Sequence, residues 1–529
     1  MNIRRTSVSQ SKKPTIILTA LGIWLTFIIG IIWPWIYKIN KLDPQIPILA
    51  YISAGIWWLI FFWTLYHLTF QVASLFVESP KKEQAYSHLP SIAIIYPTRD
   101  DFNSFSCKTC LDQNYKNFRV IICDDSVETR YKTMVREFCK NYSAVCQLIT
   151  RADNKGFKAG NLNNTIENHV TEDWVLLVDA DQFLPTDYLS ELVSILPTEL
   201  EQIAFVQGAH ETIVDYDSSD FQIALSPGTS LYYFHDLTLR QAYGFVPMLG
   251  HGALIPKKVW EVIGKFPEIV SEDFAFTLRA ATHGQRGLYI ERVRSYEAFP
   301  YDFGGFLLRL KKYAGATAEL FRQEVIPFLI KSESNIEKWD FLMQLTGYAI
   351  MPFAVINGYL GAFVSYELWN SGVSYLHPIL PYIYIWLFLT FFALKISATD
   401  GWAGAFRFYF WSTAIYTASM PLAGWHFLKH LFVRPTFNRT PKNSEETTLD
   451  PRESCAMIVL GITALTFAIK WISPFSPVLV GQGIAYLSFP IYSQLNSNSN
   501  LGHIARLVVV LPGFFMLFAI YTMWNWGRF

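Results

Sequence analysis

Charged residues are scarce in this chain, and neither sign prevails. Asp, Glu, Lys and Arg make up only 16% of the 529 residues, and 43 basic residues balance 43 acidic ones. Binding to a phosphate backbone requires a basic excess, so we expect no nucleic-acid partner. Cysteine is also rare, with six residues, which excludes a disulfide framework for a chain of this length.

The main feature of the sequence is a series of long stretches without charged residues. Hydrophobic residues account for 51% of the chain, which together with the low charge content is too apolar for a soluble protein of this size. A helix needs roughly 20 residues to cross a bilayer core. Stretches without any Asp, Glu, Lys or Arg lie at 14–37, 44–77, 341–366, 368–394, 408–428, 471–505 and 507–527. The sequence therefore predicts an integral membrane protein with the lipid bilayer as a partner.

The charged residues gather between the second and third of these stretches. This spacing predicts two transmembrane helices in 1–78, a globular domain in 79–300, interfacial helices in 301–340, transmembrane helices in 341–398, an interfacial helix and a loop in 399–452, and C-terminal transmembrane helices in 453–529. Residues 1–13 hold four basic and no acidic side chains, so the positive-inside rule places them in the cytosol. Two crossings then return the chain to the cytosol for the globular domain. The stretch near 476–493 is polar enough to be re-entrant, which leaves the side of the C-terminus open.

Short apolar strands alternate with helical patterns in the globular domain. Strands are predicted at 92–96, 119–123 and 174–178, the first ended by Pro97. This βαβ rhythm predicts a parallel sheet that binds its ligands at the carboxyl ends of the strands.

Acidic residues stand at the ends of two of these strands. Asp124 and Asp125 follow the second strand directly, and Asp179 and Asp181 follow the third. A helix cap or a turn would explain one such group, but two at successive strand ends indicate a ligand site. A DxD sequence offers two carboxylates on one side of a tight turn, which suits Mg²⁺ or Mn²⁺ that also holds a substrate diphosphate.

Five short motifs in this domain resemble those of a known family. They are YPTRDD at 96–101, DDS at 124–126, NKGFKAGNLN at 154–163, DAD at 179–181 and SED at 271–273. In order and spacing they resemble the family 2 glycosyltransferases, most closely the membrane-embedded, cellulose-synthase-like branch. The resemblance implies an α/β GT-A fold, that is, a nucleotide-sugar-binding cytosolic domain inserted in an α-helical polytopic membrane region.

The resemblance also implies a role for each motif. The implied donor-binding residues here are Thr98, Asp124, Asp125, Lys158 and Asp179. Lys158 is implied at the diphosphate, and Asp179 with Asp181 at the metal ion, Mg²⁺ or Mn²⁺. Asp273 is implied as the catalytic base, because an acceptor hydroxyl must lose its proton during attack. The alternative for residues 271–273 is a helix start with acids in its first turn.

The next signature of the branch, QxxRW, is altered in this chain. Residues 309–313 read RLKKY, so Arg309, Lys312 and Tyr313 replace Gln, Arg and Trp. Arg309 and Lys312 are implied to bind the donor, Lys312 as a point charge without a bidentate fork. The change leaves processivity open. A basic amphipathic helix on the membrane surface is the alternative.

Three residues are implied on the acceptor side. His251 lies between two glycines, where many relatives carry a small Ser or Thr in the loop that faces the acceptor. We expect His251 to contact the acceptor or the donor sugar and Glu272 to contact the acceptor, and the resemblance implies that Tyr313 stacks on the sugar ring of the acceptor.

A further match lies far downstream. Residues 437–442 read FNRTPK and resemble the FxVTxK gating loop of cellulose synthases. The resemblance implies that Phe437, Thr440 and Lys442 close over the bound nucleotide. A full crossing by 408–428 would put this loop on the far side of the membrane from the globular domain, so we expect that segment to lie in the interface.

Together these features predict an inverting glycosyltransferase in the plasma membrane, with its catalytic domain in the cytosol. We expect the donor to be a UDP-linked sugar such as UDP-glucose, and the product a β-linked polysaccharide that leaves through the protein's own channel or with accessory export subunits. One alternative is a non-processive transferase that adds one sugar to a lipid acceptor. Another is an export channel whose domain binds nucleotide without catalysis, which the intact acidic motifs disfavour.

Overall fold

The computed structural model describes most of the chain. The described residues are 18–19, 21–23, 25–26, 45–77, 89–196, 202–215, 217–332, 335–372, 389, 392, 399, 401–435 and 447–526. Most of the predicted membrane segments 14–37 and 368–394, and the predicted loop 437–442, lie outside these residues.

An eight-stranded sheet forms the centre of the globular domain. Its strands are β1 (Ile92–Thr98), β2 (Phe118–Asp124), β3 (Cys146–Thr150), β4 (Trp174–Leu177), β5 (Gln182–Phe183), β6 (Ile203–Ile213), β7 (Ala253–Pro256) and β8 (Arg286–Ala298). Their order is β3-β2-β1-β4-β7-β6-β8-β5. The pairs among β1 to β4 are parallel, whereas β7 pairs antiparallel with both β4 and β6. The three strands predicted from sequence are confirmed as β1, β2 and β4.

Both faces of the sheet are buried, which explains why these strands read as unbroken apolar runs. In β1, Ile92 and Ile94 belong to one core cluster and Ala93 and Ile95 to another, and all four are 0% exposed. The first cluster contains residues of α4 (Ser104–Leu111), α5 (Thr129–Asn141) and α7 (Tyr188–Val193). The second contains residues of α6 (Phe157–His169), α11 (Lys257–Ile263) and α12 (Glu272–Thr282). Helices on both faces are the usual cover of a parallel sheet.

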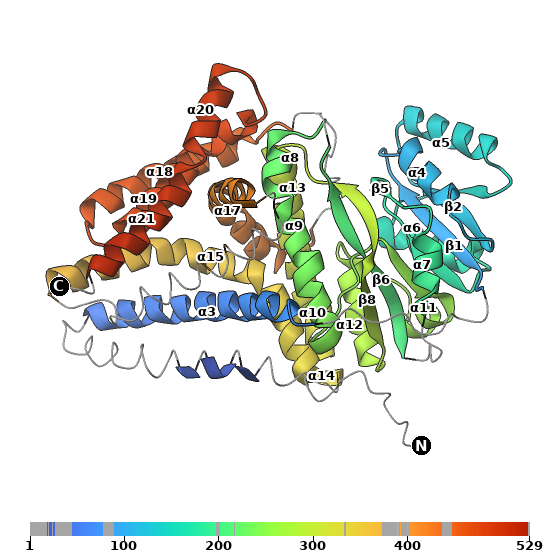
Figure 1. Cartoon of the computed structure of the whole chain (residues 1–529), viewed down its shortest axis with the longest axis horizontal. Helices are drawn as coiled ribbons and strands as arrows, with labels where there is room; N and C mark the ends of the chain where they lie inside the picture. The colour runs from blue at the N-terminus through green and yellow to red at the C-terminus, as the bar shows by residue number, and fades with distance from the viewer. Residues whose placement is uncertain are drawn as a thin grey trace.

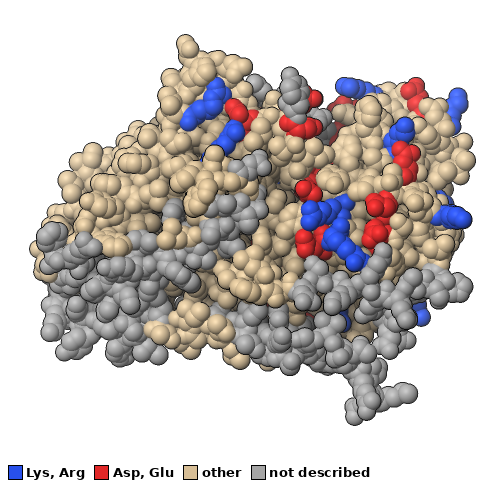
Figure 2. Space-filling view, in the orientation of Figure 1, with Lys and Arg blue, Asp and Glu red and all other residues tan. Residues whose placement is uncertain are grey.

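Long helices form the second half of the molecule (Figure 1). They are α3 (Gln45–Ser74), α15 (Asn335–Asn370), α17 (Gly401–His430), α18 (Pro451–Lys470), α19 (Ser476–Leu487), α20 (Asn500–Val508) and α21 (Leu511–Trp526), with a 3₁₀ turn at Phe489–Gln494. Among the described residues, four stretches are long and apolar enough to cross a bilayer: Pro47–Ser74, Asn335–Asn370, Pro451–Lys470 and Asn500–Asn525. Figure 2 shows charged side chains gathered over the α/β domain and near α20, whereas the described surface on the left carries almost none.

Further helices lie between the α/β domain and this group of apolar helices. Between β6 and β7 lie α8 (Asp220–Leu225), α9 (Pro227–Leu231), a π-helical turn (Tyr232–Leu237) and α10 (Thr238–Tyr243). After β8 come α13 (Phe303–Leu320), a second π-helical turn (Phe321–Val325) and α14 (Ile326–Lys331). Buried Phe306 and Leu310 of α13 share a core cluster with Trp411 and Ile415 of α17. The α/β domain therefore rests on the membrane helices through a continuous apolar core.

Helix α17 lies across the direction of the other long helices. Figure 1 shows it nearly end-on, while α3 and α15 run across the view. It is not among the four candidate spans of the described residues. The interfacial placement that the sequence predicts for 408–428 stays a prediction.

The C-terminal helices leave the α/β domain and return to it. Lys311 of α13 forms an ion pair at 2.7 Å with Glu453, near the start of α18. After α19, Asn496 donates a hydrogen bond to the carbonyl of Tyr301 at 2.8 Å and accepts one from the amide of Phe221 at 3.1 Å. Helix α19 has only 12 residues, about 18 Å, less than a bilayer core. The middle C-terminal stretch thus brings the chain back to the side of the α/β domain, and α21 leads away again (Figure 1).

Candidate active site

A cavity of about 1840 Å³ opens at the carboxyl ends of β1, β2 and β4. It brings together most of the residues that the sequence predicts for the site. Those that line it are Thr98, Asp125, Lys158, Asp179, Asp181, His251, Glu272, Asp273, Arg309, Lys312 and Tyr313. Phe437, Thr440 and Lys442 lie outside the described residues, so their predicted role stays a prediction.

The two acids after β2 have different surroundings. Arg151 binds the carboxylate of Asp125 with two hydrogen bonds, Nε to Oδ1 at 2.8 Å and Nη2 to Oδ2 at 2.6 Å. Asp124 does not line the cavity: it is buried, and its Oδ1 accepts a hydrogen bond from the amide of Ser126 at 2.8 Å. Asp124 shapes the turn, as a turn-forming aspartate does, and its contact with a donor stays a prediction. Arg151 follows β3, which only the sheet order places beside β2, so sequence reasoning missed it.

The loop after β1 is fixed by short polar contacts. Thr98 donates from Oγ1 to Oδ1 of Asp101 at 2.8 Å. Asp100, with φ of 56°, accepts hydrogen bonds from the amides of Val127 and Glu128, each at 2.8 Å. The ends of β1 and β2 are thereby tied together at the mouth of the cavity.

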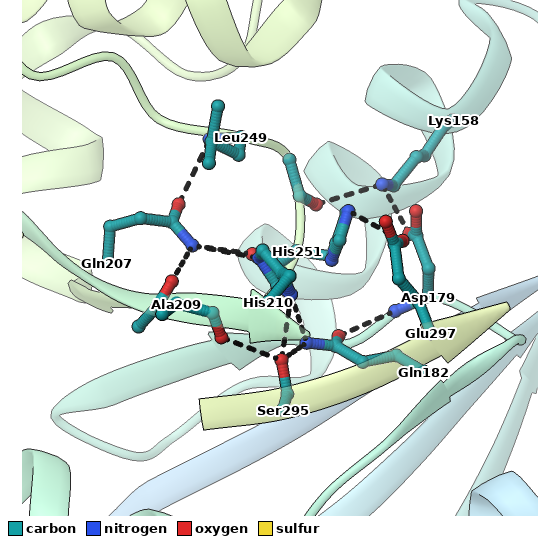
Figure 3. Close-up of polar contacts among 12 residues, drawn as sticks. Lys158, Asp179, Gln182, Gln207, Ala209, His210, Leu249, His251, Ser295 and Glu297 are labelled. Carbon is teal, nitrogen blue, oxygen red and sulfur yellow. Dashed lines mark hydrogen bonds and ion pairs between the residues drawn. The ribbon is translucent and has the colours of Figure 1, made fainter. Parts of the chain in front are cut away.

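Lys158 holds a positive charge beside the DAD turn (Figure 3). Its Nζ lies 2.5 Å from Oδ1 of Asp179 and 3.7 Å from Oε1 of Glu272, and it donates to the carbonyl of Gly250 at 2.9 Å. Burial lowers the pKa of Lys158, but Asp179 and Glu272 outweigh burial and raise this pKa above its ordinary value. The ammonium group therefore stays charged at neutral pH, where a diphosphate leaving group would need it.

Two acids lie side by side at the start of α12. Asp273 accepts hydrogen bonds at Oδ1 from the amide of Phe274 at 2.8 Å and from Oγ of Ser271 at 3.3 Å. Burial raises the pKa of Glu272 to about 7 although Lys158 opposes it, and burial also raises the pKa of Asp273. Ser271 stands at the N-cap position without a side-chain capping bond. Helix α12 thus serves as a fixed platform for both carboxylates.

His251 lies on a tight loop between two glycines in left-handed conformations. The φ angles of Gly250 and Gly252 are 79° and 62°, which favour glycine. A Cβ at Gly252 would lie 2.7 Å from the ring of His210, and one at Gly250 would lie 2.9 Å from Oδ2 of Asp273. The loop therefore lies close to the predicted base, and His251 enters the cavity from it.

The altered RxxKY segment presents one face to the cavity. Arg309, Lys312 and Tyr313 lie three and four residues apart on α13, so they share a side of the helix. The guanidinium of Arg309 stacks on the ring of Phe299 at 4.4 Å, and Nζ of Lys312 lies 5.9 Å from the ring centre of Tyr313. The opposite face of α13 is buried against α17. An amphipathic helix free on the membrane surface would not have these contacts, which favours the site interpretation.

The cavity continues from the strand ends along a membrane helix. Its lining on α3 runs from Gln71 through His67 and Thr64 to Trp57, a stripe at helical spacing. Those 14 steps correspond to about 21 Å along the helix axis. Tyr348 of α15, Tyr416 of α17 and Ile520 of α21 complete the wall at this depth. The site is therefore joined to the interior of the helical region.

The carboxylates of the DAD turn suit a divalent cation that the phosphates of a bound substrate would also coordinate. Among the described residues, no group of three or more His, Cys, Asp or Glu side chains is arranged to hold a metal ion. Asp179 and Asp181 line the cavity from one turn. Mg²⁺ is commonly bound by one or two carboxylates together with substrate phosphates and water. Two carboxylates that face a diphosphate site meet that requirement.

Comparisons with known proteins agree with the predicted family. Residues 174–398 match the family model "Glycosyl transferase family group 2". The chain is 22% identical over 277 residues to a probable glucomannan 4-beta-mannosyltransferase 7 of Oryza sativa subsp. japonica, a match that covers 50% of this chain and 45% of the relative. It is 25% identical over 259 residues to glucomannan 4-beta-mannosyltransferase 7 of Arabidopsis thaliana, covering 46% of this chain and 44% of that one. The chain thus spans less than half the length of these relatives.

A solved structure is also similar. The mannosyltransferase PcManGT from Pyrobaculum calidifontis, in complex with GDP-Man and Mn²⁺, has 16% identity and a TM-score of 0.45, and the match covers 68% of this chain and 97% of that one. The family match confirms the resemblance to family 2 glycosyltransferases that the sequence motifs carry. The predicted fold class, an α/β domain joined to an apolar helical region, is confirmed by the sheet and by the candidate spans.

Proposed function

We propose that this chain, whose residues 174–398 match the family model "Glycosyl transferase family group 2", transfers hexose units from a nucleotide-sugar to a β-linked polysaccharide and passes the product into its membrane region. One observation carries the proposal: the cavity that holds Lys158, Asp179 and Asp273 continues to Trp57. A transferase with a soluble acceptor has no need for such a path. An export channel without catalysis would not need this set of acids in the cavity.

The residues at the DAD turn would hold and neutralise the leaving diphosphate. Asp179 and Asp181 would bind the divalent cation, which supplies Lewis-acid stabilisation of negative charge on the leaving group. Lys158 would bind a phosphate oxygen with its ammonium group, which Asp179 and Glu272 keep charged. Arg309 and Lys312 line the same cavity and would add positive charge from the α13 side.

Asp273 would take the proton of the acceptor hydroxyl. It lies in the first turn of α12, its backbone is fixed, and its carboxylate reaches the cavity. Burial, which raises the pKa of Asp273, makes a carboxylate a stronger base at neutral pH. A single displacement with inversion needs only this base and the diphosphate site on opposite sides of the sugar. Glu272 is the second candidate because it lies on the same turn.

The identity of the donor is best settled by direct assay. The sequence favours a UDP-sugar, whereas the relatives are mannosyltransferases by name. The test is to incubate the purified full-length protein in detergent with radiolabelled UDP-glucose, GDP-mannose or GDP-glucose and Mg²⁺ or Mn²⁺, and to size the product. A polymer that is insoluble in organic solvent supports the proposal. A product with one sugar on an organic-soluble lipid would replace it with the single-transfer alternative, and no transfer from any donor would reject catalysis.

The membrane placement belongs to the same proposal. Nucleotide-sugars would reach the cavity from the side of the α/β domain, which we place in the cytosol. The ion pairs and hydrogen bonds that fasten α18 and Asn496 to that domain put the turns of the C-terminal hairpin on this side. Labelling of single cysteines introduced in the turn near Asn496, with a membrane-impermeant reagent in intact cells, would reveal an outward location if this placement is wrong.

A further inference from the structure

A carboxylate that sequence reasoning missed faces His251 inside the cavity. Glu297 lies at the end of β8, where its backbone pairs with Gln182 of β5 and Thr212 of β6. Its Oε2 is 3.7 Å from Nε2 of His251, and the two side chains are only 14% and 13% exposed. Nδ1 of His251 is buried without a hydrogen-bond partner. Both residues line the cavity, which is where a ligand can reach this pair.

A buried polar layer fixes the pair from behind (Figure 3). The ring centre of His210 lies 4.0 Å from that of His251. His210 contacts Oγ of Ser295 through Nδ1 at 2.7 Å and Nε2 of Gln207 through its own Nε2 at 3.3 Å. Burial holds the pKa of His210 well below its ordinary value, so this ring stays neutral. A neutral, fully buried ring under His251 leaves it little freedom to turn away.

Gln207 fixes the backbone of the loop that carries His251. Its amide group donates to the carbonyl of His251 at 2.9 Å and accepts from the amide of Leu249 at 3.0 Å. Lys158 donates to the carbonyl of Gly250 in the same loop at 2.9 Å. The position of His251 is therefore tied to the ammonium group that would bind the diphosphate.

The pair lies where the transferred sugar must be. Lys158, which with Asp179 marks the expected diphosphate, donates to the carbonyl of Gly250, and Asp273, the expected base, also lies close to Gly250. The loop thus contacts both places, so a sugar that joins the leaving group to the attacking hydroxyl has to lie beside it. His251 and Glu297 are the side chains that this part of the loop and the end of β8 present there.

We propose that Glu297 and His251 form the subsite that recognises the hydroxyl groups of the transferred hexose and so decides which sugar is accepted. This inference rests on the proposed glycosyltransferase function. A carboxylate accepts hydrogen bonds from two neighbouring hydroxyls, and an imidazole can donate or accept one more. Hydrogen bonds to a charged group are stronger than hydrogen bonds between two neutral groups. A site built to bond a hydroxyl rejects a sugar that presents it in another direction, because the buried polar groups are then left unpaired.

The test uses Glu297→Gln in the full-length protein and two pairs of donors. The donors of a pair have the same nucleotide and epimeric sugars: GDP-mannose with GDP-glucose, and UDP-glucose with UDP-galactose. Binding of each nucleotide-sugar and of the bare nucleoside diphosphate is measured by calorimetry, and transfer by kcat/KM. We expect affinity for the nucleoside diphosphate within about twofold of wild type, and a fall of about tenfold or more in the preference between epimers. An unchanged preference, or an equal loss of affinity for nucleotide and nucleotide-sugar, overturns the proposal.

Two further variants make the test specific. Glu291→Gln changes a carboxylate on the same strand that pairs with Arg294 at 3.2 Å and does not line the cavity, so its preference between epimers should equal that of the wild type. His251→Asn should lower the preference in the same direction as Glu297→Gln if both act on one sugar. A preference unchanged by His251→Asn removes that residue from the subsite and overturns the paired assignment.

The calorimetric binding measurements distinguish a failure of this inference from a failure of the proposed function. A wild type that binds nucleotide-sugars but transfers none rejects the proposed function, and the epimer preference in binding then still decides the role of Glu297. A wild type that transfers sugar while Glu297→Gln keeps its preference rejects only the subsite. A wild type that binds no nucleotide-sugar rejects both.

Discussion

At the scale of single residues, the site depends on acids whose surroundings differ. Asp125 is paired with Arg151, Asp179 with Lys158, while Glu272 is buried and lies beside the half-buried Asp273. The first two each face a cationic side chain. The last two are raised in pKa by burial, which is how a carboxylate becomes a base at neutral pH.

Asp181→Asn tests the metal site. The variant keeps the size of the side chain but removes one of the two carboxylates of the DAD turn, so we expect no transfer with Mg²⁺ or Mn²⁺ and an unchanged melting temperature. Transfer is measured with and without EDTA. Activity that survives both the substitution and EDTA would show that no divalent cation is needed.

Asp273→Asn tests the base. Because Asp273 is proposed to act on the acceptor hydroxyl and not on the nucleotide, we expect donor affinity to change by less than about tenfold and turnover to fall by roughly 10² to 10⁴. Equilibrium binding and single-turnover kinetics measure the two quantities separately. A matching loss of nucleotide affinity would instead make Asp273 a structural part of the α12 start.

The pH dependence of transfer follows from the raised pKa values. A base works only when deprotonated, so a raised pKa moves the acidic limb of kcat/KM upward. Because burial raises the pKa of Asp273 and that of Glu272 beside it, we expect the acidic limb of kcat/KM to lie above the ordinary range of a carboxyl, and the pair to titrate together. A limb near pH 4, the ordinary value of a carboxyl, would contradict this.

At the scale of helices and strands, the sequence predicts the parallel half of the sheet well and the other half poorly. β1, β2 and β4 are buried on both faces, so they read as unbroken apolar runs. β8 mixes exposed, half-buried and buried residues over 13 positions without a regular alternation, and its pairing with β6 joins segments far apart in the chain. That pairing brings Glu297 to His251, which no local pattern reveals. Arg151 was missed for the same reason.

Helix α13 connects the site to the membrane region, and Tyr313 tests this connection. The ring is 45% exposed and lines the cavity, so Tyr313→Ala should remove one stacking contact of about 1 kcal/mol and shorten the products several-fold. Tyr313→Phe keeps the ring and should restore the product length. If both variants make products of wild-type length on a sizing gel, Tyr313 does not hold the acceptor.

A buried ion cluster ties three helices together where the two halves meet. Asp340 of α15 is 0% exposed, accepts a hydrogen bond from Oη of Tyr66 of α3 at 2.7 Å, and lies 3.4 Å from Nε of Arg240 of α10. Asp340→Ala leaves Arg240 buried without this partner, so we expect a loss of about 3–5 kcal/mol of stability. Thermal inactivation in detergent measures it, with Lys338→Gln on the same helix as the control. A midpoint equal to that of the control would mean that the cluster adds no stability.

At the scale of the whole molecule, one cavity joins the strand ends to the centre of the helical region. The sequence predicts both parts, because apolar stretches and acidic motifs are local patterns. It does not predict that they share one space, since this depends on how α3, α13, α15 and α17 pack around it. Helix α13, which carries the RxxKY segment, lies where the α/β domain meets the helical region, and its buried residues pack against α17.

Filling the membrane part of this cavity tests whether it is the path of the product. Thr64 lines the cavity on α3, whereas Leu59 on the same helix is 56% exposed on the outer surface. Thr64→Trp should put a ring in the path and shorten the polymer several-fold, while the first transfer to a short acceptor keeps its rate, because the ring lies away from the acids. Leu59→Trp adds the same ring toward lipid and should change neither. Equal product lengths for both variants would reject the path, and one sugar per lipid in every variant would make the membrane region an entrance for a lipid acceptor.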